Sequence, residues 1–420
     1  MTVSQNPQSL RWIALIAAAV AMSASPESPL PTLQFAAAFL PTTTTKATIA
    51  RRDTFLAAGF GSPASASNKK KKGKNKNKKK GGGGETAAQV QQRWANKMKR
   101  VYGGISKEEI AIGTEKRIES MMVESLSEPL RNALALRSIV EVFERRISGM
   151  GEEDIRQRFT PEELQEAIAN RKAFDEHMEA NNLAPEDLQV AMQRLTWDAG
   201  ADAKACRSVT GKMAPITKIR VARASEMAYE GLTDNSDDDG LILDVGCGYG
   251  VMVPFLKKAG FKAHQIHGVD LSSEMIGHAK SFYPDVATEG KFEVVDFFED
   301  AGGGDDQEQT KYRAVVFCSA LHDMPDLKSA LIKTKNELLD AETPGSRLVV
   351  LHAQGASHVL NQNKQNPLLV PRGMPSTEEL KEWLCGDDDK GPTMRLVHEP
   401  AEPKSQGEVR EGYLAVLEIV

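Results

Sequence analysis

Four residues at alternating positions, Asp244, Gly246, Gly248 and Gly250, are the most informative chemical feature of this sequence. They begin near the end of the apolar run 241–245, which is typical of a buried strand, so the glycines belong to the turn that leaves it. Glycine has no Cβ, and its backbone therefore adopts positive φ angles and approaches a ligand closely. The spacing differs from the G-x-G-x-x-G pattern of dinucleotide-binding folds. The motif predicts a site for a nucleotide-type cofactor at the end of a strand.

A second carboxylate, Asp270, lies twenty residues after Gly250. It ends the run 265–270, which reads as a second strand, and a carboxylate there can accept hydrogen bonds from both hydroxyls of a ribose. A helix is expected to start at Ser272. We therefore expect Asp270 to hold the sugar of the same cofactor.

The remaining pattern supplies the elements that must position these residues. The runs 291–297, 312–319, 347–352, 394–398 and 413–420 predict five more strands. An amphipathic helix is expected over 326–339, with apolar positions Leu327, Ala330, Leu331, Leu338 and Leu339. Ser376 and Glu379 form a capping box that opens a helix over 378–384. Alternating strands and helices predict an α/β fold.

These motifs, in this order, resemble those of class I S-adenosylmethionine-dependent methyltransferases over about residues 235–420, and most of all the small-molecule group called type 11. The resemblance implies a seven-strand, Rossmann-like, three-layer αβα domain whose last strand inserts antiparallel, with S-adenosyl-L-methionine as the cofactor. It implies that Asp296 hydrogen-bonds the adenine amino group and that Phe297 packs against its ring. The residues expected to bind the cofactor are Asp244, Gly246, Cys247, Gly248, Gly250, Asp270, Leu271, Asp296, Phe297 and Ser319.

His322 and Asp323 follow the fourth predicted strand, at the edge where the transferable methyl group and its acceptor meet in this fold. The stretch His-Asp-x-x-Asp resembles plant-type O-methyltransferases, in which the histidine is the general base, although Met324 replaces the usual Trp. We predict His322 and Asp323 as catalytic residues, and a pocket-lining or structural histidine is the alternative. Cys247 has no histidine nearby in the sequence to activate it, so it is expected to be a small side chain beside the cofactor and not a nucleophile.

Charge is distributed unevenly along the chain. The net charge is −5, while residues 1–80 carry 13 Lys and Arg against two acids, so the remainder carries −16. An acidic body argues against broad nucleic-acid affinity for the part that does the chemistry. The four cysteines fall at no metal or disulfide spacing, which indicates a reducing compartment and no metal site. Nothing in the sequence indicates membrane contact by the folded body or fixes an oligomeric state.

The first 84 residues are expected to be targeting sequence. An eleven-residue apolar run, 12–22, is typical of a signal-peptide core, and the run 36–41, Ala-Ala-Ala-Phe-Leu-Pro, resembles the cleavage motif of bipartite presequences in algae with secondary plastids. We predict a signal peptide over 1–38, then a transit peptide and a Lys- and Gly-rich linker over 39–84, directing the protein to a complex plastid. The secretory pathway and the mitochondrion are the alternatives. The nine lysines of 69–80 are read as linker, and an electrostatic tether to a polyanion is the alternative.

Residues 85–234 predict a helical accessory domain before the methyltransferase domain 235–420. Thr160 and Glu163 form a capping box with Pro161 at the first helical position, and another helix starts near Ala184. A stripe at helical spacing is expected to face the core of this segment: Leu136, Ile139, Val140, Phe143 and Ile147.

The sequence therefore predicts transfer of a methyl group from S-adenosylmethionine to a small acceptor molecule, and a lipophilic acceptor is compatible with this prediction. Two alternatives stay open. One is a protein or RNA methyltransferase that docks through the lysine run, and the other is a non-catalytic scaffold that keeps the fold.

Overall fold

The computed structural model describes most of the chain after residue 106. The described ranges are 107–147, 150–209, 213–230, 240–300, 310–386, 391–400 and 412–420, with single helical positions between 89 and 96. The predicted signal peptide, transit peptide and lysine run lie outside the described residues. Among the residues described, no helix has the length and apolar character needed to cross a membrane.

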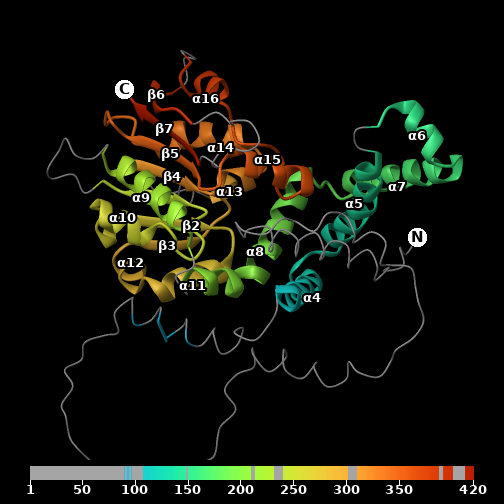
Figure 1. The fold of residues 1–420 in the computed structure, drawn as a ribbon, viewed down its shortest axis with the longest axis horizontal. Helices are drawn as coiled ribbons and strands as arrows, with labels where there is room; N and C mark the ends of the chain where they lie inside the picture. The colour runs from blue at the N-terminus through green and yellow to red at the C-terminus, as the bar shows by residue number, and fades with distance from the viewer. Residues whose placement is uncertain are drawn as a thin grey trace, which may run out of the picture. The chain divides into compact units, whose positions relative to one another are not determined.

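A seven-stranded sheet in the order β3-β2-β1-β4-β5-β7-β6 forms the centre of the C-terminal half (Figure 1). Its strands are β1 Ile242–Val245, β2 Ile266–Asp270, β3 Lys291–Val294, β4 Ala314–Cys318, β5 Arg347–His352, β6 Met394–His398 and β7 Tyr413–Ile419. The first five are parallel, and β7 runs antiparallel between β5 and β6. All seven predicted strands are present and the antiparallel last strand is confirmed, so the fold is the Rossmann-like class I methyltransferase fold. The third strand is shorter than predicted: it ends at Val294, because Phe297 already starts a short helix.

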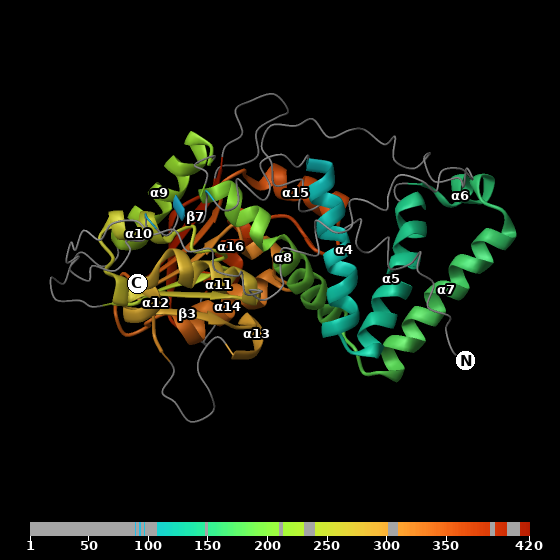
Figure 2. The same ribbon diagram turned by 90° about the horizontal axis from the view of Figure 1, so that it is seen from below.

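Helices cover both faces of the sheet, as Figures 1 and 2 show. One face packs on α9 Pro215–Glu230, α10 Val253–Ala259, α11 Ser273–Phe282 and α12 Pro284–Glu289. The other packs on α13 Phe297–Asp300, α14 Leu327–Lys333 and α16 Thr377–Leu384. Neighbouring strand residues alternate between the two cores, as the period of a strand requires: Val316 faces the first and Phe317 the second. The expected helix over 326–339 is α14 followed by a π-helical turn, Thr334–Leu338.

The helical segment before the sheet consists, among the described residues, of α4 Lys107–Ser125, α5 Glu128–Ile147, α6 Glu152–Arg158, α7 Pro161–Ala180 and α8 Pro185–Val209. Its apolar core includes residues from beyond β5: Val359 on α15 Ala356–Gln365, and Leu369 and Val370 after it. The segment is therefore joined to the part of the chain that follows β5 by a shared core. Helix α9, which the predicted boundary at residue 234 groups with this segment, packs instead on the sheet.

The predicted apolar stripe of α5 is only partly correct. Val140 is buried, but Ile139 is 38% exposed. The buried face is shifted around the helix and includes Leu134, Ser138 and Glu141, because α5 turns this side toward its helical neighbours. Glu141 is tolerated there because Arg145 contacts its carboxylate at 2.5 Å.

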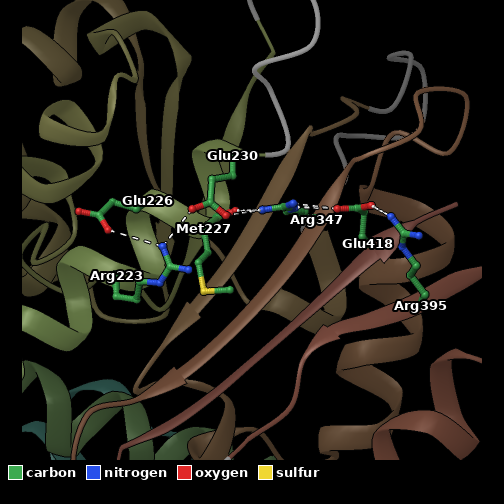
Figure 3. A network of polar contacts seen from close by, with 7 residues as sticks. All are labelled: Arg223, Glu226, Met227, Glu230, Arg347, Arg395 and Glu418. Carbon is green, nitrogen blue, oxygen red and sulfur yellow. Dashed lines mark hydrogen bonds and ion pairs between the residues drawn. The ribbon is translucent and has the colours of Figure 1, made fainter.

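Arg347 joins α9 to the sheet at the amino end of β5 (Figure 3). It donates to both the Met227 carbonyl of α9, at 2.6 Å, and the Glu418 carboxylate of β7, at 2.8 Å. Arg395 of β6 donates to the other oxygen of Glu418. This network lies at the opposite end of the strands from the glycine turn. It therefore stabilises the packing of α9 on the sheet without contacting that turn.

Candidate cofactor and acceptor site

The three motif glycines all adopt positive φ, of 67°, 55° and 82° for Gly246, Gly248 and Gly250. A Cβ on Gly246 would lie 2.4 Å from the Cβ of Ala320, so the turn after β1 touches the turn after β4. A Cβ on Gly250 would lie 2.8 Å from the Tyr283 ring. Gly248 differs, because no atom lies within 4 Å of its Cβ position. Open space above Gly248 is what a closely approaching ligand needs.

Asp270, the last residue of β2, is fixed through both carboxylate oxygens. The Gly248 amide donates to Oδ2 and the Ser272 amide donates to Oδ1, each at 2.8 Å. Asp270 thus links the glycine turn to the start of α11. Burial raises its pKa to about 6, although these two amides lower it, and the charges of Asp198 and Asp323 raise it further.

Asp244 in β1 is 1% exposed, and among the described residues neither of its carboxylate oxygens has a hydrogen-bond partner. Burial and the charge of Asp270 raise its pKa to about 8. A buried carboxylate without a partner is costly, so these oxygens fit a positively charged or hydrogen-donating ligand.

The other predicted cofactor residues lie around the same edge of the sheet. Burial and the charges of Asp244 and Asp270 raise the pKa of the Cys247 thiol, which keeps it protonated and agrees with a packing role. Ser319 follows β4 with a φ of 56°, a strained value that is common at functional sites. Leu271 is half-buried beside Asp270.

Asp296 and Phe297 begin the short helix α13, just after β3. The Asp296 carboxylate accepts from the Phe298 amide at 3.1 Å. The Phe297 ring is buried and contacts Phe317 at a centroid distance of 5.6 Å. The adenine contacts of both residues stay predictions.

His322 and Asp323 form the turn Leu321–Asp323 directly after Ala320. The His322 Nε2 lies 3.4 Å from Asp323 Oδ1, so the two predicted catalytic residues contact each other. The His322 side chain is nearly buried, and its Nδ1 has no hydrogen-bond partner in the part of the chain that the structure describes. The Asp323 carboxylate favours the tautomer with the proton on Nε2, which leaves Nδ1 as the nitrogen able to accept a proton.

Three groups of site neighbours were not predicted from the sequence. His352, at the end of β5, contacts the His322 ring at a centroid distance of 4.8 Å, and burial followed by the charges of His322 and His358 holds its pKa well below the usual range. Gln189 and Gln193 of α8 donate to the Asp323 carbonyl. Asp198, also of α8, accepts from Ser272. His352 was predicted only as the last residue of the strand 347–352, and nothing in the sequence indicated the contacts from α8.

The edge of the sheet thus combines acidic side chains, Asp244, Asp270 and Asp323, with the partly buried glycine turn. Acidic side chains suit a cationic ligand such as a sulfonium, and the fixed Asp270 suits a ribose. The described residues contain no cluster of three or more His, Cys, Asp or Glu side chains arranged to hold a metal ion.

Residues 220–385 match the family described as a methyltransferase domain. The protein is a methyltransferase. The family match, the sheet order and the glycine turn together identify this protein as an enzyme that uses S-adenosyl-L-methionine as its cofactor.

Solved structures of methyltransferases are among the matches of this chain. The magnesium protoporphyrin IX methyltransferase of Synechocystis PCC 6803 with bound SAM is 16% identical, with 55% of this chain and 95% of that chain covered and a TM-score of 0.35. The plantazolicin methyltransferase BpumL in complex with SAH is 15% identical, with 56% and 97% covered and a TM-score of 0.37. An S-adenosylmethionine dependent methyltransferase of Mesorhizobium loti is 16% identical, with 48% and 97% covered and a TM-score of 0.34. No curated protein matches the chain.

Proposed function

We propose that this methyltransferase acts on a small-molecule acceptor whose reacting group carries a proton, and that His322 removes this proton. The observation that carries the proposal is the contact between the two turns at the sheet edge. Gly246 meets Ala320, and His322 with Asp323 follows Ala320 directly. A base is thereby held beside the predicted cofactor turn.

S-adenosylmethionine supplies a methyl group on a sulfonium, which an aligned nucleophile displaces directly. In this proposal His322 Nδ1 accepts the acceptor's proton, and the Asp323 carboxylate, 3.4 Å from Nε2, stabilises the imidazolium that forms. Gln189 and Gln193 hold the Asp323 backbone and so fix the pair. The acidic residues Asp244 and Asp270 bind and orient the cationic cofactor.

The surroundings of His322 support a small acceptor. His322 is 5% exposed, and the core shared by α8, Val359 and Leu369 lies next to the same edge of the sheet. A base enclosed in this way excludes water and favours a ligand that can be surrounded.

The test is methyl transfer from labelled S-adenosylmethionine into a metabolite extract that has been filtered to remove macromolecules. We expect label in a small molecule, and a fall of about 10²–10⁴-fold in kcat for His322→Ala with cofactor affinity unchanged. His264→Ala, on an exposed turn before β2, is the matched control. Label appearing only in protein or RNA would contradict a small acceptor, and full activity of His322→Ala would contradict the base.

We propose in addition that residues 1–84 direct the protein into a complex plastid, with Phe39 as the first residue after signal cleavage. The support is the Ala-Ala-Ala-Phe-Leu-Pro run and the scarcity of acidic residues behind it. A fluorescent fusion of residues 1–84 should enter the plastid, and Phe39→Ala should divert it. Accumulation of the unmodified fusion in mitochondria or the secretory pathway would contradict this.

A further inference from the structure

Helix α8 precedes the matched methyltransferase region, yet it contacts two turns of the cofactor edge. Gln189 and Gln193 reach the turn after β4, and Asp198 reaches the turn after β2. One helical turn further on, Asp202 contacts the His278 ring of α11 at 2.9 Å. Helix α8 therefore lies along α11, as Figure 2 also shows.

Asp198 contacts Ser272, the residue whose backbone amide binds the Asp270 carboxylate. The Ser272 hydroxyl donates to Asp198 Oδ1 at 2.5 Å, and the Glu274 amide donates to the same oxygen at 3.2 Å. The Ser272 amide in turn donates to Asp270 Oδ1. Asp198 is 7% exposed and Ser272 is fully buried, so water does not replace these bonds easily.

We propose that Asp198 is a positioning residue of the cofactor site, which fixes the Asp270–Ser272 turn for the ribose and whose charge sets the pH range in which the cofactor binds. The inference rests on the predicted ribose contact of Asp270. It goes beyond the proposed function because it assigns part of the cofactor site to the helical segment.

The charge argument follows from the groups around Asp270. Burial raises the pKa of Asp270 to about 6, the Ser272 and Gly248 amides lower it, and the Asp198 and Asp323 carboxylates raise it. Asp244 in β1 is a further acidic neighbour, coupled to Asp270 by charge. On the neighbouring helices, Glu274 is paired with Arg117 of α4, and Asp202 is paired with His278. A protonated Asp270 is a poorer acceptor for ribose hydroxyls, so affinity should fall as pH drops through about 6.

Calorimetry with S-adenosylhomocysteine and the full chain, between pH 5 and pH 8, tests the proposal. This probe lacks the sulfonium charge, so it reports the ribose contact without direct attraction to Asp198. Asp198→Asn keeps an oxygen that accepts from Ser272 and Glu274 but removes the charge. We expect it to move the midpoint of the affinity curve to lower pH while affinity at pH 7.5 stays within about twofold. Asp198→Ala also removes the acceptor and should lose about fivefold to tenfold in affinity at pH 7.5.

Asp202→Asn is the matched control, because it makes the same change on the same helix without touching Ser272. It should leave the midpoint in place. A midpoint that does not move in Asp198→Asn, or that moves equally in Asp202→Asn, would overturn the proposal, as would unchanged affinity in Asp198→Ala. If the unmodified protein did not bind the probe at any pH, the predicted cofactor site would fail together with this inference, whereas the other results leave that site intact.

Discussion

Gly246 and Gly248 have the same backbone conformation but different surroundings. Both have positive φ, which costs a residue with a Cβ about 1–2 kcal/mol. Only at Gly246 does the added carbon also collide with the protein, at Ala320. One glycine therefore permits packing between two turns, and the other leaves space for a ligand.

Alanine at each position separates these two tasks. We expect Gly246→Ala to lower the melting temperature strongly, because Ala320 has little room to move. Gly248→Ala should keep most of the stability and lose cofactor affinity, since its methyl group points into the open space. Thermal unfolding and calorimetry with S-adenosylhomocysteine measure the two effects. Equal losses of stability in both variants would refute the distinction.

Asp244 links the site to the pH dependence of stability. Its pKa is about 8 in the folded protein and about 3.9 in an unfolded chain, so the folded state binds the proton more tightly. This contribution to stability is complete below pH 4 and is lost as pH rises through about 8. Between pH 6.5 and 8.5 the loss should be on the order of 2 kcal/mol in the ligand-free protein.

Asp244→Asn should remove this dependence, because an amide does not titrate. Urea unfolding of both proteins at pH 6.5 and 8.5 measures it, at pH values where Asp270 is already largely ionised. Asp285→Asn is the control, since hydrogen bonding and charge from Lys257 hold the pKa of Asp285 below its usual value despite some burial. If Asp244→Asn lost as much stability over this range as the unmodified protein, the assignment would be wrong.

At the scale of elements, α8 connects the helical segment to the acceptor turn. The Gln193 side-chain amide donates to the carbonyls of both Asp323 and Leu369. Its removal leaves these carbonyls without that donor, at a cost of about 1–3 kcal/mol. We expect Gln193→Ala to lower kcat for the acceptor about tenfold, because the Asp323 carbonyl loses one of its two donors on α8 and keeps Gln189, with little change in cofactor affinity.

Steady-state kinetics with the acceptor found in the metabolite screen, together with calorimetry for the cofactor, provide the measurement. Gln157→Ala on α6 is a suitable control, because that side chain is exposed and bonds only within its helix. A selective loss of cofactor affinity in Gln193→Ala would place its role elsewhere.

The elements that the sequence predicted well are those whose signal is local. The central strands β1, β4 and β5 are short runs of mostly apolar residues, and Ser376 and Thr160 cap their helices as expected. The α5 stripe failed because that helix carries apolar residues on more than one side. Which side is buried depends on α7 and α8, and the sequence of α5 does not contain that information.

The same limit applies to the site. Asp270 and the glycines were predictable because their positions relative to the strand ends determine where they lie. Asp198 and Gln193 act from a separate helix, whose docking on α11 is set by tertiary packing. No local pattern distinguishes them from solvent-facing residues of an ordinary helix.

At the scale of the whole molecule, stability and chemistry are separated to opposite ends of the strands. Arg347 and His352 are the first and last residues of β5. We expect Arg347→Ala to cost about 3 kcal/mol, because Glu418 is 9% exposed and keeps only Arg395. Cofactor affinity should be unchanged. Arg156→Ala, which breaks an exposed pair on α6, should change neither quantity. A weakened cofactor affinity in Arg347→Ala would show that the two ends are coupled.

The positive charge near the N-terminus and the negative charge of the rest of the chain allow an assay to distinguish a small acceptor from RNA. Residues 1–80 carry +11 and the rest carries −16, and nine of the cations lie in 69–80. If the acceptor is small, these lysines contribute nothing to its binding, so replacing 69–80 by a Gly/Ser segment of equal length should leave kcat/KM within about twofold.

If the acceptor were RNA, the acidic body would repel it and the lysines would have to supply the attraction. Turnover would then fall steeply between about 50 and 200 mM salt and collapse in the replaced variant. Equal rates of both proteins toward the small acceptor at both salt concentrations are the expected result, and a salt-dependent loss confined to the unmodified chain would favour the polyanion tether.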